Sequence, residues 1–231
     1  MPAENLLLLP GMMCDARLWA PQVAAIDVQS RVADLTTADN LPQLARNVLA
    51  EAPARFALAG LSMGGILAFE VWRQAPERVS HLALIDTNPH AEAPARQSLR
   101  LLQIEEALDG RLRELASESL KPLYLAEANR DDQALLDTIL DMALDLGPKV
   151  FRNQSMALMG RPDSVPTLAT ITCPTSVICG EDDLLCPVAY HELMAREITG
   201  AKLAVLKNCG HLASLEQPGK VTNELNELLR T

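Results

Sequence analysis

The sequence predicts an α/β fold, with an open, mainly parallel sheet of about six strands, helices on both faces and one helical insertion. Short apolar segments alternate along the chain with stretches of helical period. Such alternation is typical of strand–helix–strand units and therefore of parallel sheets. Between Asp86 and Cys173 no strand candidate occurs, and the apolar pattern there is helical. This interval is the predicted insertion.

The strand candidates are short runs rich in Leu, Val, Ile and Ala, and helical segments fit between them. They are residues 6–9, 31–35, 56–59, 82–86, 175–179 and 202–206. Residues 41–49 have apolar side chains at positions 41, 44, 45, 48 and 49, the spacing of one helix face, and Pro53 ends this segment. Similar spacing predicts helices near 17–26, 64–75, 188–198 and 219–230.

The insertion divides the chain into two expected parts. Residues 99–104 and 135–140 have apolar side chains at helical spacing. We therefore expect a core formed by residues 1–88 and 166–231, and a helical cap formed by residues 89–165.

Composition limits the classes of partner. The 231 residues are 48% hydrophobic and 22% charged, which is ordinary for a globular domain that buries one large core. Lys and Arg number 20 against 30 Asp and Glu, so the net charge is -10. Because this charge opposes contacts with phosphates, nucleic acid is not expected as a partner. The charge says little about a small-molecule substrate, because salt screens exposed charges beyond about 8 to 10 Å.

The cysteines and the N-terminal segment indicate the compartment. The five cysteines are an odd number without a C-x-x-C pair, so neither a disulfide framework nor a zinc site is predicted. Glu4 lies where a secretory signal would be basic, and no stretch approaches the roughly 20 apolar residues that span a bilayer. We expect a cytoplasmic protein that does not enter membranes. The sequence does not indicate an oligomeric state.

The strongest chemical signal is the segment Gly60-Leu61-Ser62-Met63-Gly64, which matches G-x-S-x-G between a strand candidate and a helix candidate. A serine that turns sharply out of a strand end needs flanking residues without a side chain, because a Cβ there would collide with the turn or with the following helix. The segment predicts Ser62 as a nucleophile. A glycine-rich turn that merely closes a strand is the alternative.

A serine hydroxyl is a weak nucleophile, so a base must take its proton, and imidazole titrates in the useful range. His211 follows the last strand candidate and precedes the last helix candidate, at the carboxyl edge of the sheet where ligands bind in such folds. The other histidines, His81, His90 and His191, lack a comparable position. His211 is therefore the predicted base.

The imidazole in turn needs a carboxylate that fixes its tautomer and stabilises its positive charge. Asp183 follows the fifth strand candidate and is our first choice. Asp182, the residue before it, is the second.

The chain order Ser62, Asp183, His211 resembles that of the α/β-hydrolase family, and the resemblance covers nearly the whole chain. Many members have a leading antiparallel hairpin, whereas this chain resembles the family from the third strand onward. The resemblance implies a sheet of about six strands and leaves the site intact, because the three residues lie on later elements.

The family's local patterns favour one acid. Its acid usually lies three residues after a strand-ending glycine, as Asp183 follows Gly180, and its histidine often lies in G-H-x-x-x-x-E-x-P, which residues 210–218 reproduce. The resemblance therefore favours Asp183 over Asp182. Because some members take the acid from the preceding strand, Asp86, at the end of the fourth strand candidate, is a third candidate, but we interpret it as a structural acid at the strand end.

Acyl transfer also needs donors for the negative oxygen of the tetrahedral intermediate, each worth about 3 to 4 kcal/mol. One expected donor is the backbone NH of Met63, at the positive end of the helix that begins there. The other is the NH of Met12, in the loop after the first strand. In that loop Pro10 replaces the histidine that the family usually has, but a backbone donor does not require that histidine.

The resemblance implies a serine hydrolase that cleaves a small or medium carboxylic ester or lactone through an acyl-enzyme on Ser62. The alternatives on the same triad are C–C bond hydrolysis, acyl transfer, and a non-catalytic ligand-binding sensor. No cofactor and no metal are implied. Arg152 and Arg161, near the end of the cap, are candidates to bind a substrate carboxylate, with pairing at the surface as the alternative.

Overall fold

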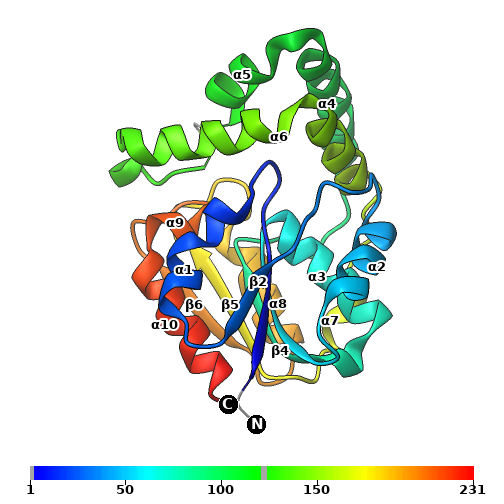
Figure 1. The fold of residues 1–231 in the computed structure, drawn as a ribbon, viewed down its shortest axis with the longest axis vertical. Coiled ribbons are helices and arrows are strands. Elements are labelled where there is room, and N and C mark those ends of the chain that lie inside the picture. Colours follow the sequence, from blue (N-terminus) through cyan, green and yellow to red (C-terminus); the bar gives the residue numbers. More distant parts are fainter. Residues whose placement is uncertain (1–2, 121–123) are drawn as a thin grey trace.

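The computed structural model describes residues 3–120 and 124–231. Its centre is one six-stranded sheet in the order β2-β1-β3-β4-β5-β6, in which every neighbouring pair is parallel (Figure 1). The strands are β1 (Asn5–Leu9), β2 (Gln29–Val32), β3 (Phe56–Leu61), β4 (Val79–Ile85), β5 (Thr175–Gly180) and β6 (Lys202–Leu206). The predicted α/β class is confirmed. The strand order reverses between β1 and β3, and the carboxyl ends beside such a reversal are where open α/β sheets bind ligands.

Helices cover both faces of the sheet. The α-helices are α1 (Ala20–Ala25), α2 (Leu41–Glu51), α3 (Met63–Gln74), α4 (Pro94–Glu106), α5 (Leu112–Glu114), α6 (Gln133–Met159), α7 (Val165–Leu168), α8 (Val188–Glu197), α9 (Ala213–Glu216) and α10 (Pro218–Leu229). Short 3-10 or π turns are η1 (Ala16–Trp19), η2 (Pro76–Arg78), η3 (Ala107–Arg111), η4 (Leu115–Leu120) and η6 (Glu127–Asn129). One core cluster joins α2, α3 and α8 to the sheet, and a second joins η1 and α10 to its other face.

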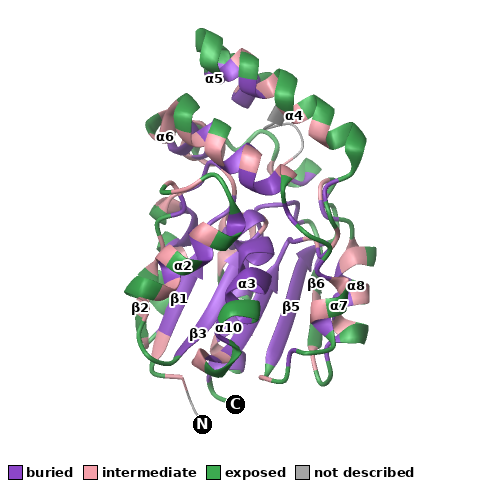
Figure 2. Ribbon diagram, turned by 90° about the vertical axis from the view of Figure 1, so that its right-hand side faces the viewer, coloured by how far each residue is buried: buried purple, intermediate pink, exposed green. Residues whose placement is uncertain are grey.

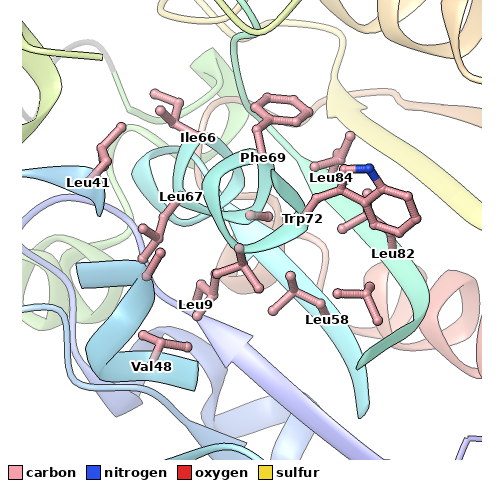
Figure 3. Packing of buried hydrophobic residues seen from close by; sticks show 14 of the residues in the cluster. Leu9, Leu41, Val48, Leu58, Ile66, Leu67, Phe69, Trp72, Leu82 and Leu84 are labelled. Carbon is pink, nitrogen blue, oxygen red and sulfur yellow. The ribbon is translucent and has the colours of Figure 1, made fainter. Parts of the chain in front are cut away.

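The central helix of the first cluster is α3. Its residues 63 to 72 are all buried, so packing rather than amphipathic patterning determines this element. Phe69 and Trp72 contact the same cluster as Leu58 and Leu82 of the adjacent strands (Figure 3). Since a fully buried side chain of this size contributes about 1.5 to 3 kcal/mol, the cluster holds the start of α3 firmly against the sheet.

A layer of helices from α4 to α6, residues 94–159, lies beyond the carboxyl ends of the strands (Figures 1 and 2). It has its own apolar cluster, which includes Ile104 and Phe151. Gly147, with φ of 79°, and Pro148 interrupt the long helix α6. The helical pattern predicted for residues 99–104 and 135–140 is confirmed. The division into a core and a cap stays a prediction at this point.

Two predicted elements differ from the structure. The second strand was expected at residues 31–35, but β2 spans Gln29–Val32 and its residues are exposed or half-buried, because it lies at the sheet edge. The apolar signal came from Leu35, which is buried in the loop after the strand. The helix expected near 17–26 is split into η1 and α1, whose second residue is Pro21.

The described part of the chain contains no helix that is both long enough and apolar enough to cross a bilayer.

His191, on α8, ties that helix to the end of β4. Its Nε2 accepts a hydrogen bond from the backbone NH of Thr87 at 2.9 Å, so its Nδ1 carries the proton and faces the carbonyl oxygen of Pro187 at 3.3 Å. Burial lowers the pKa of His191 to about 4, while the nearby Asp183 acts in the opposite direction. The neutral imidazole is therefore part of the fold near the carboxyl edge.

We predict that stability falls in acid because of His191. Its pKa is about 4 in the folded protein, and about 6.5 in an unfolded chain. The unfolded state therefore binds more protons as the pH falls from about 6.5 to about 4, at up to about 1.4 kcal/mol per pH unit. The free energy of unfolding, measured by urea denaturation at several pH values across this range, should depend less steeply on pH in His191→Gln than in wild type. Tyr190→Phe, on the same helix, is the control. Equal slopes for all three proteins would contradict the assignment.

Candidate active site

Ser62 occupies a strained turn between β3 and α3. Its φ is 55° and its ψ is -114°, a conformation that residues with a Cβ rarely adopt. The turn is fixed on both sides: the NH of Ser62 donates to the carbonyl oxygen of Ile85 at 2.9 Å, and the Thr87 hydroxyl donates to the carbonyl oxygen of Ser62 at 2.8 Å. The Ser62 side chain is therefore presented at the carboxyl edge in one orientation.

The two glycines of the motif make this turn sterically allowed. A Cβ on Gly60 would lie 2.4 Å from the carbonyl carbon of Gly64, and a Cβ on Gly64 would lie 2.1 Å from the carbonyl oxygen of Leu9. Both distances are far below van der Waals contact with rigid backbone. The glycines are thus required by the close approach of β3, α3 and β1, and not by flexibility.

The structure brings three of the predicted residues together. His211 Nε2 lies 2.8 Å from Ser62 Oγ, and His211 Nδ1 lies 2.8 Å from Asp183 Oδ2. Asp183 and His211 are buried, and Ser62 is half-buried. A continuous line of hydrogen bonds therefore runs from a carboxylate through an imidazole to an accessible hydroxyl.

Asp183 is also fixed in place by its own loop. Its Oδ1 accepts hydrogen bonds from the NH groups of Leu185 at 2.8 Å and Cys186 at 2.9 Å, which leaves Oδ2 for the imidazole. Asp182, the second candidate, is exposed. The carboxylate that orients His211 in this structure is that of Asp183.

Asp86, the third candidate, contacts backbone and not the imidazole. Its Oδ1 accepts from the NH of Gly180 at 2.9 Å, and its Oδ2 accepts from the NH of Ala213 at 3.0 Å. Asp86 thus joins the end of β5 to the segment that follows His211. Burial, and next the charge of Asp183, raise the pKa of Asp86 well above its usual value despite these two hydrogen bonds.

Glu216 holds the histidine loop against the segment before α6. One carboxylate oxygen accepts from the NH of Gly210 at 2.9 Å and from that of Leu212 at 3.3 Å. The other accepts from the NH of Ala126 at 2.8 Å and from the side-chain amide of Asn129 at 2.9 Å. Glu216 therefore satisfies the backbone on both sides of His211 and connects it to residues 126–129.

Tyr124 makes a second contact between these segments. The NH of His211 donates to the carbonyl oxygen of Tyr124 at 2.7 Å, and the two rings stack with centroids 6.0 Å apart. The imidazole is thus oriented by its backbone, by its neighbour ring and by Asp183.

Of the two residues expected to provide oxyanion donors, Met63 directly follows Ser62 in the chain, and Met12 lines a cavity together with Ser62. Met63 is the first residue of α3, and Met12 lies in the loop after β1, where Met13 has a φ of 56°. That loop is held by α6, because the NH of Met13 donates to the side-chain oxygen of Gln154 at 2.8 Å. For the described residues, no acceptor is recorded for the NH of Met12 or Met63.

Two cavities, of about 290 and 270 Å³, open onto this centre. Both are lined by Ser62 and His211, and both extend under the helical layer, where Arg96 and Arg100 of α4 line each of them. The second cavity also reaches Met12. Two groups of a substrate can therefore extend in different directions from the serine.

A group of potential metal ligands coincides with this centre. Asp183, Cys186 and His211 have ligand atoms within 4.8 Å of one another. Burial and the charge of Asp183 raise the pKa of the Cys186 thiol well above its usual value, so the cysteine is a neutral thiol. Since His211 already bonds Asp183 through one ring nitrogen and Ser62 through the other, this donor set fits proton transfer better than metal binding.

The two arginines singled out from the sequence have different surroundings. Arg152 is exposed, and its Nη1 lies 3.7 Å from Asp39 and 2.8 Å from Asn153. Arg161 lines the first cavity, but its guanidinium is engaged by Glu92 and by the carbonyl oxygen of His90. Neither presents a free fork of donors to the serine.

The sequence did not predict several residues that support or line the site around Ser62 and His211 from distant segments of the chain. Four of these residues lie in the predicted insertion: Arg96, Arg100, Tyr124 and Gln154. Helical periodicity in that segment predicts an apolar face, but it does not predict which polar side chains line the cavities. Glu216 was part of the G-H-x-x-x-x-E-x-P pattern, and that was the only signal of its position.

The comparisons with known proteins cover nearly the whole chain. A model of the alpha/beta hydrolase family matches residues 6–225. A pimeloyl-[acyl-carrier protein] methyl ester esterase of Nitrosomonas europaea is 24% identical over 93% of this chain and 91% of that protein. A putative carbamate hydrolase of Serratia proteamaculans is 26% identical over 98% of this chain and 90% of that protein.

Solved structures give the same picture. A thermophilic esterase from Thermogutta terrifontis superposes with a TM-score of 0.90 and 26% identity, over 99% of this chain and 90% of that chain. The enol-lactonase from Burkholderia xenovorans superposes with a TM-score of 0.87 and 24% identity, over 100% and 93% respectively. The fold is thus shared over nearly all of this chain and at least 90% of each of those two chains.

We predict that Glu216→Gln loosens the histidine loop. Replacing one carboxylate oxygen by an amide group sets an NH₂ against NH donors, and a buried donor left without an acceptor costs about 1 to 3 kcal/mol. Urea denaturation should show this loss, and amide hydrogen exchange should quicken in residues 124–129 and 208–216. Glu227→Gln, an exposed change on the neighbouring α10, is the matched control. A variant as stable and as protected as that control would contradict the role given to Glu216.

Proposed function

Because the chain belongs to the α/β hydrolase family, we propose that it is a serine hydrolase that cleaves a small or medium carboxylic ester or lactone. Ser62 is the nucleophile, His211 the general base and Asp183 the residue that orients the base. The observation that carries this proposal is the pair of 2.8 Å hydrogen bonds that join the three side chains in that order. A hydrolase acting on ester bonds also agrees with the named activities of the relatives.

The first half of the reaction forms an acyl-enzyme. As Ser62 Oγ attacks the acyl carbon, His211 Nε2 takes the hydroxyl proton across the 2.8 Å contact. The imidazolium that results is stabilised by Asp183 through Nδ1. His211 then gives its proton to the leaving alcohol oxygen as the ester bond breaks, so the base is restored.

The negative oxygen of the tetrahedral intermediate is bound by the NH groups of Met12 and Met63. Met63 adds the positive end of α3, a helix of 12 residues. Gln154 supports this hole indirectly, because its bond to Met13 fixes the loop that carries Met12. Each backbone donor of this kind contributes about 3 to 4 kcal/mol to the stabilisation of the transition state.

The second half uses water. His211 takes a proton from a water molecule, whose oxygen attacks the acyl carbon, and then returns the proton to Ser62 Oγ as the acyl–enzyme bond breaks. For a lactone the leaving alcohol stays attached to the acyl group, so one open-chain hydroxy acid is released. No step needs a cofactor.

Residues 89–165 act as the cap that shapes the substrate site over a core formed by residues 1–88 and 166–231. Support comes from the lining of both cavities, to which α4 contributes side chains while the core contributes Ser62 and His211. Substrate choice is thus assigned to the cap and chemistry to the core.

We predict that Ser62→Ala abolishes hydrolysis of short nitrophenyl esters. The expected loss in kcat is about 10³- to 10⁶-fold, as for other serine triads in which the nucleophile is removed. Circular dichroism and thermal melting should be unchanged, since the turn does not depend on the hydroxyl. Ser98→Ala, an exposed change on α4, is the matched control and should retain activity.

A fluorophosphonate probe separates the enzyme from a sensor with the same residues. We expect covalent labelling at Ser62 together with ester turnover. Labelling without turnover of any ester or lactone would favour a ligand-binding sensor, and residual turnover in Ser62→Ala would remove Ser62 from the mechanism.

A further inference from the structure

We infer that this site is selective for esters that carry a second, anionic group, a carboxylate on the acyl or the alcohol part, which Arg96 and Arg100 bind. The inference rests on the proposed ester hydrolysis and goes beyond it by naming the chemical class of the substrate. It starts from the charges that line the two cavities.

The lining of the cavities is cationic in an acidic protein. Arg96, Arg100 and Arg161 line the first cavity, and Arg96 and Arg100 also line the second. Glu92 is the only acidic residue that lines either cavity within the described residues. Because the whole chain has a net charge of -10, this local excess of positive charge is not a reflection of average composition.

The single acid is already neutralised. The Glu92 side chain is 3% exposed, and its Oε2 lies 2.7 Å from Arg100 Nε and 2.8 Å from Arg161 Nη1. Its Oε1 accepts from Arg161 Nη2 at 3.2 Å. Since two guanidinium groups share one carboxylate, this buried cluster has a net positive charge before Arg96 is counted.

Three of the five NH donors of Arg161 are already used within the protein. Its Nη1 and Nη2 both bond Glu92, and its Nε donates to the carbonyl oxygen of His90 at 2.9 Å. The role of Arg161 is therefore to hold Glu92, which in turn orients Arg100. Arg161 was a candidate from the sequence to bind a substrate carboxylate. We assign that role to Arg96 and Arg100 instead.

Arg100 and Arg96 have donors to spare. Arg100 uses Nε for Glu92 and directs Nη1 to the sulfur of Met12 at 3.4 Å, and no partner is recorded for its Nη2 among the described residues. Within the described part of the chain, the Arg96 side chain forms no ion pair and no hydrogen bond. Four residues apart on α4, the two side chains lie on one helix face.

The start of α4 adds to this field. Ala93, which precedes the helix and lines the first cavity, provides no side-chain cap. The partial positive charge of this helix N-terminus therefore lies next to the first cavity, which both arginines also line.

A carboxylate fits this arrangement better than a neutral group does. The planar guanidinium presents pairs of NH donors that match the two carboxylate oxygens, and charge-assisted hydrogen bonds are about twice as strong as neutral ones. The apolar lining by Leu158 and Leu185, common to both cavities, suits the methylene or aromatic part between that carboxylate and the ester.

The test compares esters that differ only in charge. For the acyl side the pair is monomethyl adipate and dimethyl adipate; for the alcohol side it is 4-acetoxybenzoate and its methyl ester. We expect a higher kcat/KM for the anionic member of at least one pair. In Arg96→Gln the ratio of anionic to neutral kcat/KM should fall about tenfold, because one charge-assisted hydrogen bond at an exposed position is lost. Arg46→Gln, the same change on α2, should keep the ratio.

Two results would overturn the inference: neutral esters preferred in both pairs, or an anionic preference that survives in Arg96→Gln combined with Arg100→Gln. A binding measurement keeps this test separate from the proposed chemistry. Calorimetry with adipate on Ser62→Ala should show binding that weakens with added salt and about tenfold with Arg96→Gln. If adipate binds but no ester is hydrolysed, the proposed function is refuted and the anion site stands. If esters are hydrolysed but adipate does not bind, the anion site is refuted and the proposed function stands.

Discussion

The close packing of three backbone segments, the ends of β1 and β3 and the start of α3, is the constraint on which the site depends. Gly64 approaches the Leu9 carbonyl so closely that no side chain fits between them. This contact lets the chain reverse at Ser62 with a positive φ, and the buried side chains of α3 hold the helix in that place. The strain at Ser62 is therefore maintained by the core and not by the loop itself, which is how unfavourable backbone conformations persist at functional positions.

Three buried or half-buried carboxylates complete the arrangement by binding backbone NH groups. Asp183 fixes its own loop, Asp86 joins β5 to the segment after His211, and Glu216 joins the histidine loop to residues 126–129. Loops that cross the edge of a parallel sheet expose NH groups without partners in the ladder, and an anionic acceptor satisfies two or more of them at once. The histidine is placed by acids that never contact the serine.

The sequence was most informative where the determinants are local. The turn at Ser62 requires glycines within two residues, and His211 lies in a short motif, so residues adjacent in the sequence predict both positions. The second strand was misplaced because Leu35 is buried by tertiary packing outside any strand, and periodicity does not distinguish the two cases. Gln154, Arg96 and Arg100 reach the site from helices whose distance from Ser62 depends on how the insertion folds back. No local pattern encodes that distance.

The neighbouring acids Asp86 and Asp183 show how burial separates two roles. Each accepts two backbone NH groups, but only Asp183 also faces an imidazole. Burial, and next the charge of Asp183, raise the pKa of Asp86. A difference in surroundings, and not in residue type, therefore decides which acid serves the base and which one serves the fold.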